Sequence, residues 1–113
     1  MVLECIEIAV REGQEPAFEA ALLEVRQRVF MSPGFRGFAV HRSLTRPGVY
    51  EVRVTWETAA ELAGFMRERS GRAWEPVREF LAGPPRVDHL EERPSLGLAG
   101  PGVVTDLDWV RQA

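Results

Sequence analysis

Two histidines are the side chains of this 113-residue chain best suited to move protons near neutral pH. His41 alternates with Phe38 and Val40, so we expect it to point away from the core and make a structural or interface hydrogen bond. His89 lies between Val87 and Leu90, and its direction depends on which of these two faces the helices. We take His89 as the candidate base. Two isolated histidines predict no metal site.

Tryptophan is the second residue type with chemical potential, because its ring can hold a planar aromatic substrate by stacking. Trp56 lies on an apolar face, where a large aromatic is more often part of the core. Trp74 follows Ser70-Gly71, a break at which an opening between helical segments could admit a ligand. The sequence contains no phosphate loop, nucleophile elbow or dinucleotide fingerprint.

Composition excludes several classes of partner. The chain has 14 Lys and Arg against 17 Asp and Glu, a net charge of −3 without a basic run, so we expect no nucleic-acid partner. A single cysteine, Cys5, permits no internal disulfide and fits a reducing cytoplasm. No segment approaches the roughly 20 apolar residues that cross a bilayer, so we expect a cytoplasmic protein without a membrane partner.

The first half of the chain predicts a strand, a helix and a hairpin. Residues 2–10 alternate, with Val2, Ile6 and Ile8 on one side and Leu3 and Cys5 on the other. Apolar residues then recur at helical spacing from Phe18 to Val29. Two strand-like segments, 35–44 with Leu44 inward and 49–56, flank the turn signal Arg46-Pro47-Gly48 and predict a hairpin.

The second half predicts helices and a last strand. Thr58 and Glu61 form a capping box that starts a helix with Leu62, Phe65 and Met66 inward. A short helix follows over residues 73–81, and residues 86–92 predict a fourth strand. The order is that of an α+β, ferredoxin-like split βαβ fold: an antiparallel four-stranded sheet with helices on one face.

The uncovered face of this sheet predicts a homodimer. It would carry apolar residues such as Leu3, Ala39 and Val49 among charged ones such as Glu51 and Arg53, and a second copy would bury both kinds. We divide the chain into a domain of residues 1–93 and an extension of residues 94–113. The extension carries Trp109, for which docking on the partner subunit is the favoured expectation and docking on its own domain the alternative.

Three segments resemble one known family. They are residues 8–18, a strand that enters a helix through Gly13; residues 32–37, Ser-Pro-Gly-Phe-Arg-Gly; and residues 50–58, a strand from Tyr50 to Trp56-Glu57-Thr58. In this order they resemble the antibiotic biosynthesis monooxygenase (ABM) domain, over about residues 2–92. The resemblance implies a dimeric α/β barrel.

The same resemblance implies a small-molecule function. Characterised members include cofactor-independent oxygenases acting on quinols and anthrones, and their substrate lies between the sheet and the second helix. In this chain that pocket would be lined by Ile6, Ile8, Phe38, Val40, Val54, Trp56, Phe65, Met66 and Trp74. A monooxygenase of the ABM type that acts on a small hydrophobic or aromatic substrate, without a cofactor, is therefore the first hypothesis.

The haem-degrading branch of the family is disfavoured. It uses an asparagine on the first strand, where the resemblance places Ile6, and a tryptophan on the second helix, where it places Phe65. Its iron-binding histidine would fall near Pro76, and no histidine occurs between Arg42 and Asp88. We therefore expect no haem and no metal.

A non-catalytic binding or sensing protein with the same fold is the alternative hypothesis. A cavity lined by Trp74 that also contains a buried titratable group would favour an enzyme. A cavity without an acid or base would favour binding, and a fully packed interior would point to a structural role.

Overall fold

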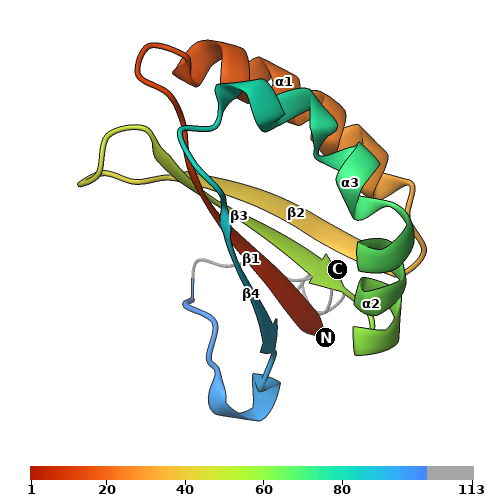
Figure 1. Cartoon of the computed structure of the whole chain (residues 1–113). Coiled ribbons are helices and arrows are strands. Elements are labelled where there is room, and N and C mark those ends of the chain that lie inside the picture. The colour runs from red at the N-terminus through yellow and green to blue at the C-terminus, as the bar shows by residue number, and fades with distance from the viewer. Residues whose placement is uncertain (102–113) are drawn as a thin grey trace, which may run out of the picture.

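The computed structural model describes residues 1–101 (Figure 1). The strands are β1 (Val2–Ala9), β2 (Phe35–Arg42), β3 (Val49–Trp56) and β4 (Arg86–Glu91). The helical segments are α1 (Glu15–Phe30), α2 (Ala59–Glu68), α3 (Ser70–Ala73) and the 3-10 helices η1 (Glu75–Phe80) and η2 (Pro94–Leu96). The predicted order of strands and helices is confirmed.

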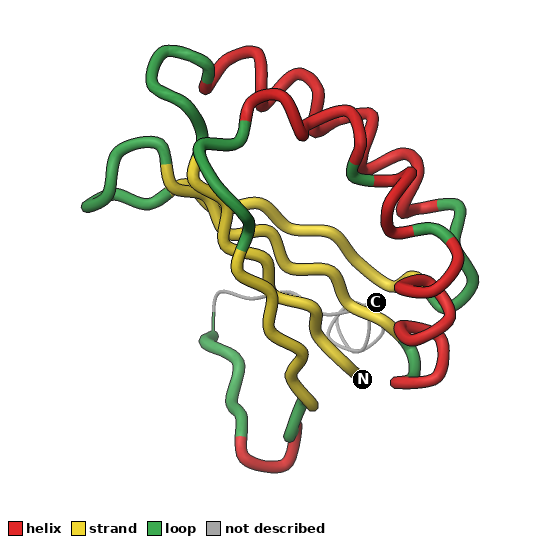
Figure 2. The backbone as a smooth tube through the Cα atoms, viewed as in Figure 1, coloured by secondary structure: helices red, strands yellow, loops and turns green. Residues whose placement is uncertain are grey.

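The four strands form one antiparallel sheet in the order β2-β3-β1-β4 (Figure 1). The helices α1, α2 and α3 all lie over one face of this sheet, and the other face carries none of them (Figure 2). This is the α+β ferredoxin-like arrangement predicted from the sequence. It leaves β4 as an edge strand next to β1, which is the element pair that forms one wall of the candidate site.

The core lies between the sheet and the helices. Strand β1 alternates between buried and partly exposed residues, and Ile6 and Ile8 are buried beneath the helices. From α1 the residues Phe18, Leu22, Val25 and Val29 pack onto them at the predicted helical spacing. Burying each large aliphatic or aromatic side chain of this kind stabilises the fold by roughly 1.5–3 kcal/mol.

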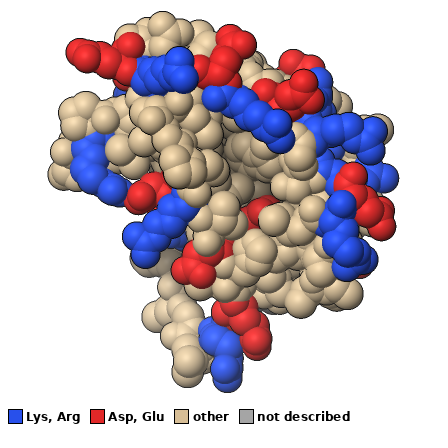
Figure 3. All heavy atoms as spheres, in the orientation of Figure 1, with Lys and Arg blue, Asp and Glu red and all other residues tan. Residues whose placement is uncertain are grey.

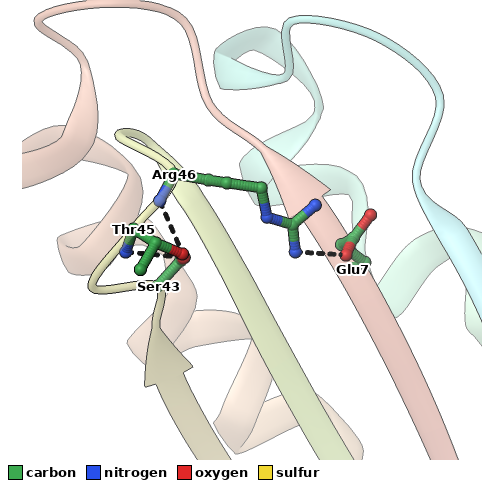
Figure 4. Close-up of polar contacts among 4 residues, drawn as sticks. All are labelled: Glu7, Ser43, Thr45 and Arg46. Atoms are coloured by element: carbon green, nitrogen blue, oxygen red, sulfur yellow. Dashed lines mark hydrogen bonds and ion pairs between the residues drawn. The ribbon is translucent and has the colours of Figure 1, made fainter.

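The turn between β2 and β3 differs from the prediction at its start. Strand β2 ends at Arg42, and Leu44, expected to point inward, lies in the turn and is fully exposed. The Oγ atom of Ser43 accepts hydrogen bonds from the backbone N–H groups of Thr45 and Arg46, at 3.3 and 3.0 Å, and this local pairing bends the chain out of the strand (Figure 4). Arg46 then reaches β1, where its Nη2 lies 2.7 Å from Glu7 Oε1 (Figure 4).

Helix α2 begins where the capping residue predicts. The Oγ1 atom of Thr58 accepts a hydrogen bond from the backbone N–H of Glu61 at 3.2 Å. The expected break at Ser70 contains the four-residue helix α3, and the expected short third helix is the 3-10 helix η1, with Pro76 in its first turn. The chain therefore changes direction between α2 and η1, above β1 and β4.

Two expectations on the chain ends stay predictions. The division at residue 93 is not decided by the fold, although residues 94–101, which include η2, are exposed. Trp109 lies outside the described residues. Within residues 1–101 no helix is long and apolar enough to span a membrane.

Candidate functional site

A carboxylate interrupts the apolar face of β1. Glu4 shares its side of the strand with Val2 and Ile6, so its side chain points toward the helices, and the residue is 2% exposed. A carboxylate rarely occupies such a position unless it is paired or has a chemical role, because burial disfavours its charged form. This makes Glu4 the starting point of the site.

Glu4 lines a cavity of about 230 Å³ between the sheet and the helical segments. The surrounding residues come from β1, α2, α3, η1 and β4, and they are mainly apolar: Glu4, Ile6, Ile8, Met66, Ser70, Trp74, Val77, Arg78, Leu81, Pro85 and Val87. Figure 3 shows the molecular surface hollowed between the helices and the sheet, with mostly uncharged walls. The change of direction between α2 and η1 places Trp74 on the wall of this cavity.

The surroundings of Glu4 have opposing effects on its protonation. Burial raises the pKa of the carboxyl group above its ordinary value, and this is the largest effect. The charge of His89 and the nearby indole N–H of Trp56 lower the pKa in part. Within the described part of the chain neither Glu4 Oε1 nor Trp56 Nε1 has a hydrogen-bond partner of normal geometry, so the indole lies near the carboxyl group without satisfying it.

His89 lies beside Glu4 on the neighbouring strand. The two residues are directly paired in the β1–β4 register, and His89 Nε2 is 3.8 Å from Glu4 Oε2. The open question of its direction is thereby answered: His89 faces the helices together with Val87, which pairs with Ile6. Its side chain is 42% exposed and lines an adjoining, more open recess of about 560 Å³ instead of the Glu4 cavity. Met66 lines both spaces.

The structure brings some of the predicted pocket residues to the cavity and leaves others in the core. Ile6, Ile8, Met66 and Trp74 line it, whereas Val40 is exposed on β2 outside it. Val54, Trp56 and Phe65 are buried in the hydrophobic core, where the Trp56 and Phe65 rings are 4.8 Å apart. Phe38 does not line the cavity but contacts one of its walls, because its ring stacks on Trp74 with 6.4 Å between centroids.

Other polar residues lie away from this cavity. His41 is exposed on the sheet face that carries no helix, where it pairs with Glu51 in the register. Tyr50 donates a hydrogen bond to Glu19, and burial together with that carboxylate raises the pKa of the tyrosine to about 12, so the phenol stays neutral. Among residues 1–101 no group of three His, Cys, Asp or Glu side chains could hold a metal ion.

Sequence reasoning missed Glu4, although a signal was present. The residue has the same parity as Val2, Ile6 and Ile8, so the alternation that defines the apolar face of β1 also places Glu4 on it. A single acidic residue on such a face is the pattern that a buried functional carboxylate leaves in a sequence. The resulting arrangement, an apolar cavity with one carboxyl group and an aromatic wall, can hold a small ring and accept a proton from it.

Comparisons with known proteins identify the family of the chain. The sequence model of the family described as antibiotic biosynthesis monooxygenase matches residues 1–76. A solved protein from Bordetella bronchiseptica that is assigned to this family is 31% identical, with a TM-score of 0.74 over 81% of this chain and 96% of that one. No curated protein sequence matches the chain.

Two more distant structures share the fold. A variant of SnoaB, a cofactor-independent oxygenase from Streptomyces nogalater, is 14% identical, with a TM-score of 0.71 over 84% of this chain and 95% of that one. A variant of MhuD with two manganese protoporphyrin IX molecules bound per active site is 24% identical, with a TM-score of 0.72 over 88% of this chain and all of that one. At these identities the likeness concerns the fold alone.

Proposed function

The chain belongs to the antibiotic biosynthesis monooxygenase family, and we propose that it is a cofactor-independent monooxygenase that oxidises a small, readily deprotonated aromatic compound. One observation carries the proposal: an apolar cavity, walled by Trp74, contains the buried carboxyl group of Glu4. A cavity for binding alone needs no such group, and leaving one unpaired costs about 1–3 kcal/mol. The combination therefore supports an enzyme over a non-catalytic binding or sensing protein.

The reaction class follows from what such a site offers. A phenolate or a related carbanion is electron-rich enough to reduce O₂ itself, so the protein has to bind the ring, remove a proton and exclude water. The apolar walls of the cavity exclude water, and Trp74 offers a face for stacking. Both features support a quinol-like substrate.

The size of the cavity narrows the substrate further. At about 230 Å³ it is smaller than the roughly 300–1,000 Å³ typical of sites for drug-sized ligands. We therefore expect one- or two-ring phenols and quinols to be preferred over three-ring anthrones. Met66 at the border with the adjoining recess is the side chain that limits the length of the ring system.

We further propose that the active form is a homodimer in the cytoplasm. The sheet face without helices carries the partly exposed Leu3 and Val49 and the exposed Ala39, next to Glu51 and Arg53, which form an ion pair within one chain at 2.6 Å. Packing two such faces together would bury the apolar residues. The single cysteine, Cys5, on the same face is compatible with a reducing compartment.

Oxygen uptake by the purified protein tests the function. A panel of phenols, quinols and anthrones is supplied without added cofactor, and oxygen consumption is compared with the rate in buffer alone. Saturable uptake with one- or two-ring substrates that falls in Trp74→Ala, while the variant keeps its circular dichroism spectrum, is the expected result. Uptake at the uncatalysed rate for every compound would leave the binding or sensing role as the better account.

A further inference from the structure

The proposed reaction needs a group that takes a proton from a buried phenol, and the geometry of two paired residues identifies it. Building on the proposed function, we infer that Glu4 is the general base of the cavity and that His89 is a positioning residue that holds its carboxylate. This assignment moves the base from the exposed imidazole to the buried carboxylate, and it gives both residues a defined role.

Glu4 is the ionisable residue with the right access. Among the described residues that line the cavity, only Glu4 and Arg78 are ionisable, and Arg78 donates a hydrogen bond to the Gly71 carbonyl at 3.1 Å. A guanidinium stays protonated and cannot accept a proton. The hydroxyl of Ser70, also on the wall, is too weak a base in its neutral form. The carboxylate is thus the proton acceptor that a ligand in this cavity would meet.

The two oxygens of Glu4 have different surroundings. Oε2 lies 3.8 Å from His89 Nε2, whereas Oε1 is buried and has no hydrogen-bond partner among residues 1–101. Glu4 lines the apolar cavity, and an unpaired buried oxygen of such a residue is an unused acceptor, which a phenol hydroxyl group that reaches it can satisfy. Oε1 is therefore the oxygen that we assign to the substrate.

His89 anchors the other oxygen from the strand next to it. A protonated imidazole at 3.8 Å attracts the carboxylate and favours its ionised form, the form that a base requires. His89 is 42% exposed and lines the adjoining recess, so it does not contact a ligand in the Glu4 cavity. The other charged groups nearby are Arg78 from η1, and Arg67 and Glu91 in the recess of His89.

The proton balance of the reaction closes with one base. Glu4 takes the hydroxyl proton of a phenol that has an unsubstituted ring carbon, and the phenolate gives one electron to O₂. The two radicals join in a new C–O bond, and the terminal peroxide oxygen takes the proton back from Glu4. Glu4 then removes the hydrogen from the same carbon, the O–O bond breaks, and the departing hydroxide takes this proton. The products are a quinone and one molecule of water, so the substrate loses two hydrogens and gains one oxygen.

Kinetics of matched variants test the assignment. Glu4→Gln keeps the shape of the side chain but cannot accept the proton, and we expect kcat to fall by about 10²–10⁴-fold, the usual contribution of a general base. Binding of 1,4-naphthoquinone, used as a product probe, should change less than about threefold. His89→Gln should lower kcat by about tenfold and move the acidic limb of the pH profile upward. Glu12→Gln, a carboxylate-to-amide change at an exposed residue outside both spaces, is the control and should alter neither kcat nor the pH profile.

Carbon-13 NMR of the Glu4 carboxyl group provides a readout that does not need turnover. Because the charge of His89 lowers the pKa of Glu4, this pKa should rise in His89→Gln and stay unchanged in Glu12→Gln. If the wild type is active and the Glu4→Gln variant keeps its kcat, Glu4 is not the general base. If the pKa of Glu4 is the same in the wild type and in His89→Gln, His89 is not a positioning residue. A wild type that takes up no oxygen would instead overturn the proposed function.

Discussion

Glu4 and His89 occupy paired positions on β1 and β4, and their side chains meet on the helix-covered face with 3.8 Å between Oε2 and Nε2. One partner is buried at 2% exposure, and the side chain of the other is 42% exposed. The edge position of β4 makes this possible, because its outer side has no neighbouring strand among the described residues. A buried carboxylate thus has an imidazole partner that is itself in contact with water.

The first prediction concerns pH-dependent stability. The pKa of Glu4 is raised in the folded state, so the folded protein binds a proton more tightly than the unfolded chain. Its stabilising contribution is present at low pH and is lost as pH rises from the ordinary value of 4.5 through the folded pKa. The Glu4→Gln variant has no carboxyl group at this position, so its stability does not fall with pH for this reason. Between pH 3 and 7 the unfolding free energy of the wild type should therefore fall relative to the variant by about 1–3 kcal/mol, the cost of an unpaired buried group.

Urea unfolding at several pH values measures this difference. Glu91→Gln serves as the control, because Glu91 is an exposed carboxylate on the same strand as His89. If the unfolding free energies of the wild type and Glu4→Gln change with pH in the same way, burial of the Glu4 carboxylate does not destabilise the fold.

The second prediction separates the two described tryptophans. Trp56 is fully buried against Phe65, and Trp56→Ala should lower the unfolding free energy by about 3–5 kcal/mol through a cavity in the core. Trp74 lines the ligand cavity, and Trp74→Ala should weaken binding of 1,4-naphthoquinone by about 2–10-fold, the value of lost aromatic stacking. Denaturant unfolding and fluorescence titration measure the two effects. Equal loss of stability in both variants would place Trp74 in the core as well.

The third prediction concerns substrate size. Met66 lines both the cavity of about 230 Å³ and the adjoining recess, so Met66→Ala should connect them. The ratio of kcat/KM for three-ring anthrones to that for two-ring quinols should rise by about tenfold, within the range that small changes in an apolar pocket produce. Met31→Ala, an exposed methionine outside both spaces, is the matched control. An unchanged ratio would mean that Met66 does not limit the site.

The fourth prediction tests the homodimer. Ala39 is exposed on the helix-free face and pairs with Arg53 in the register of β2 and β3. Ala39→Arg adds a second positive charge there and should convert a dimer to a monomer in sedimentation at micromolar concentration. Leu23→Arg, on the exposed side of α1, should leave the dimer intact. A wild type that sediments as a monomer would contradict the dimer directly.

Much of the fold could be predicted from the sequence because local signals agree with each other. Phe18, Leu22, Val25 and Val29 recur at helical spacing and are buried, and Thr58 starts α2 as its capping role requires. The end of β2 could not be predicted from alternation. Leu44 continues the alternation of apolar residues, but the hydrogen bond that Ser43 Oγ accepts from the backbone N–H of Arg46 stabilises a turn at this point. A local hydrogen bond outweighs periodicity at that point.

Less of the site could be predicted, since alternation gives the face of a side chain but not its depth. Trp56 and Ile6 share the helix-covered face, yet only Ile6 lines the cavity, because Phe65 covers the indole. The direction of His89 depends on the pairing of two strands that are distant in the sequence. Glu4 was accessible to sequence reasoning through its parity, and its chemical meaning appears only once the cavity beside it is known.

Oxygen-isotope labelling tests the monooxygenase assignment most directly. Wild-type protein is given a two-ring phenol that it oxidises, under ¹⁸O₂ and in unlabelled water, and the quinone is analysed by mass spectrometry. The account predicts one ¹⁸O atom in each product molecule and the second in water. A quinone whose new oxygen comes from the solvent, or no product beyond that formed without protein, would contradict it.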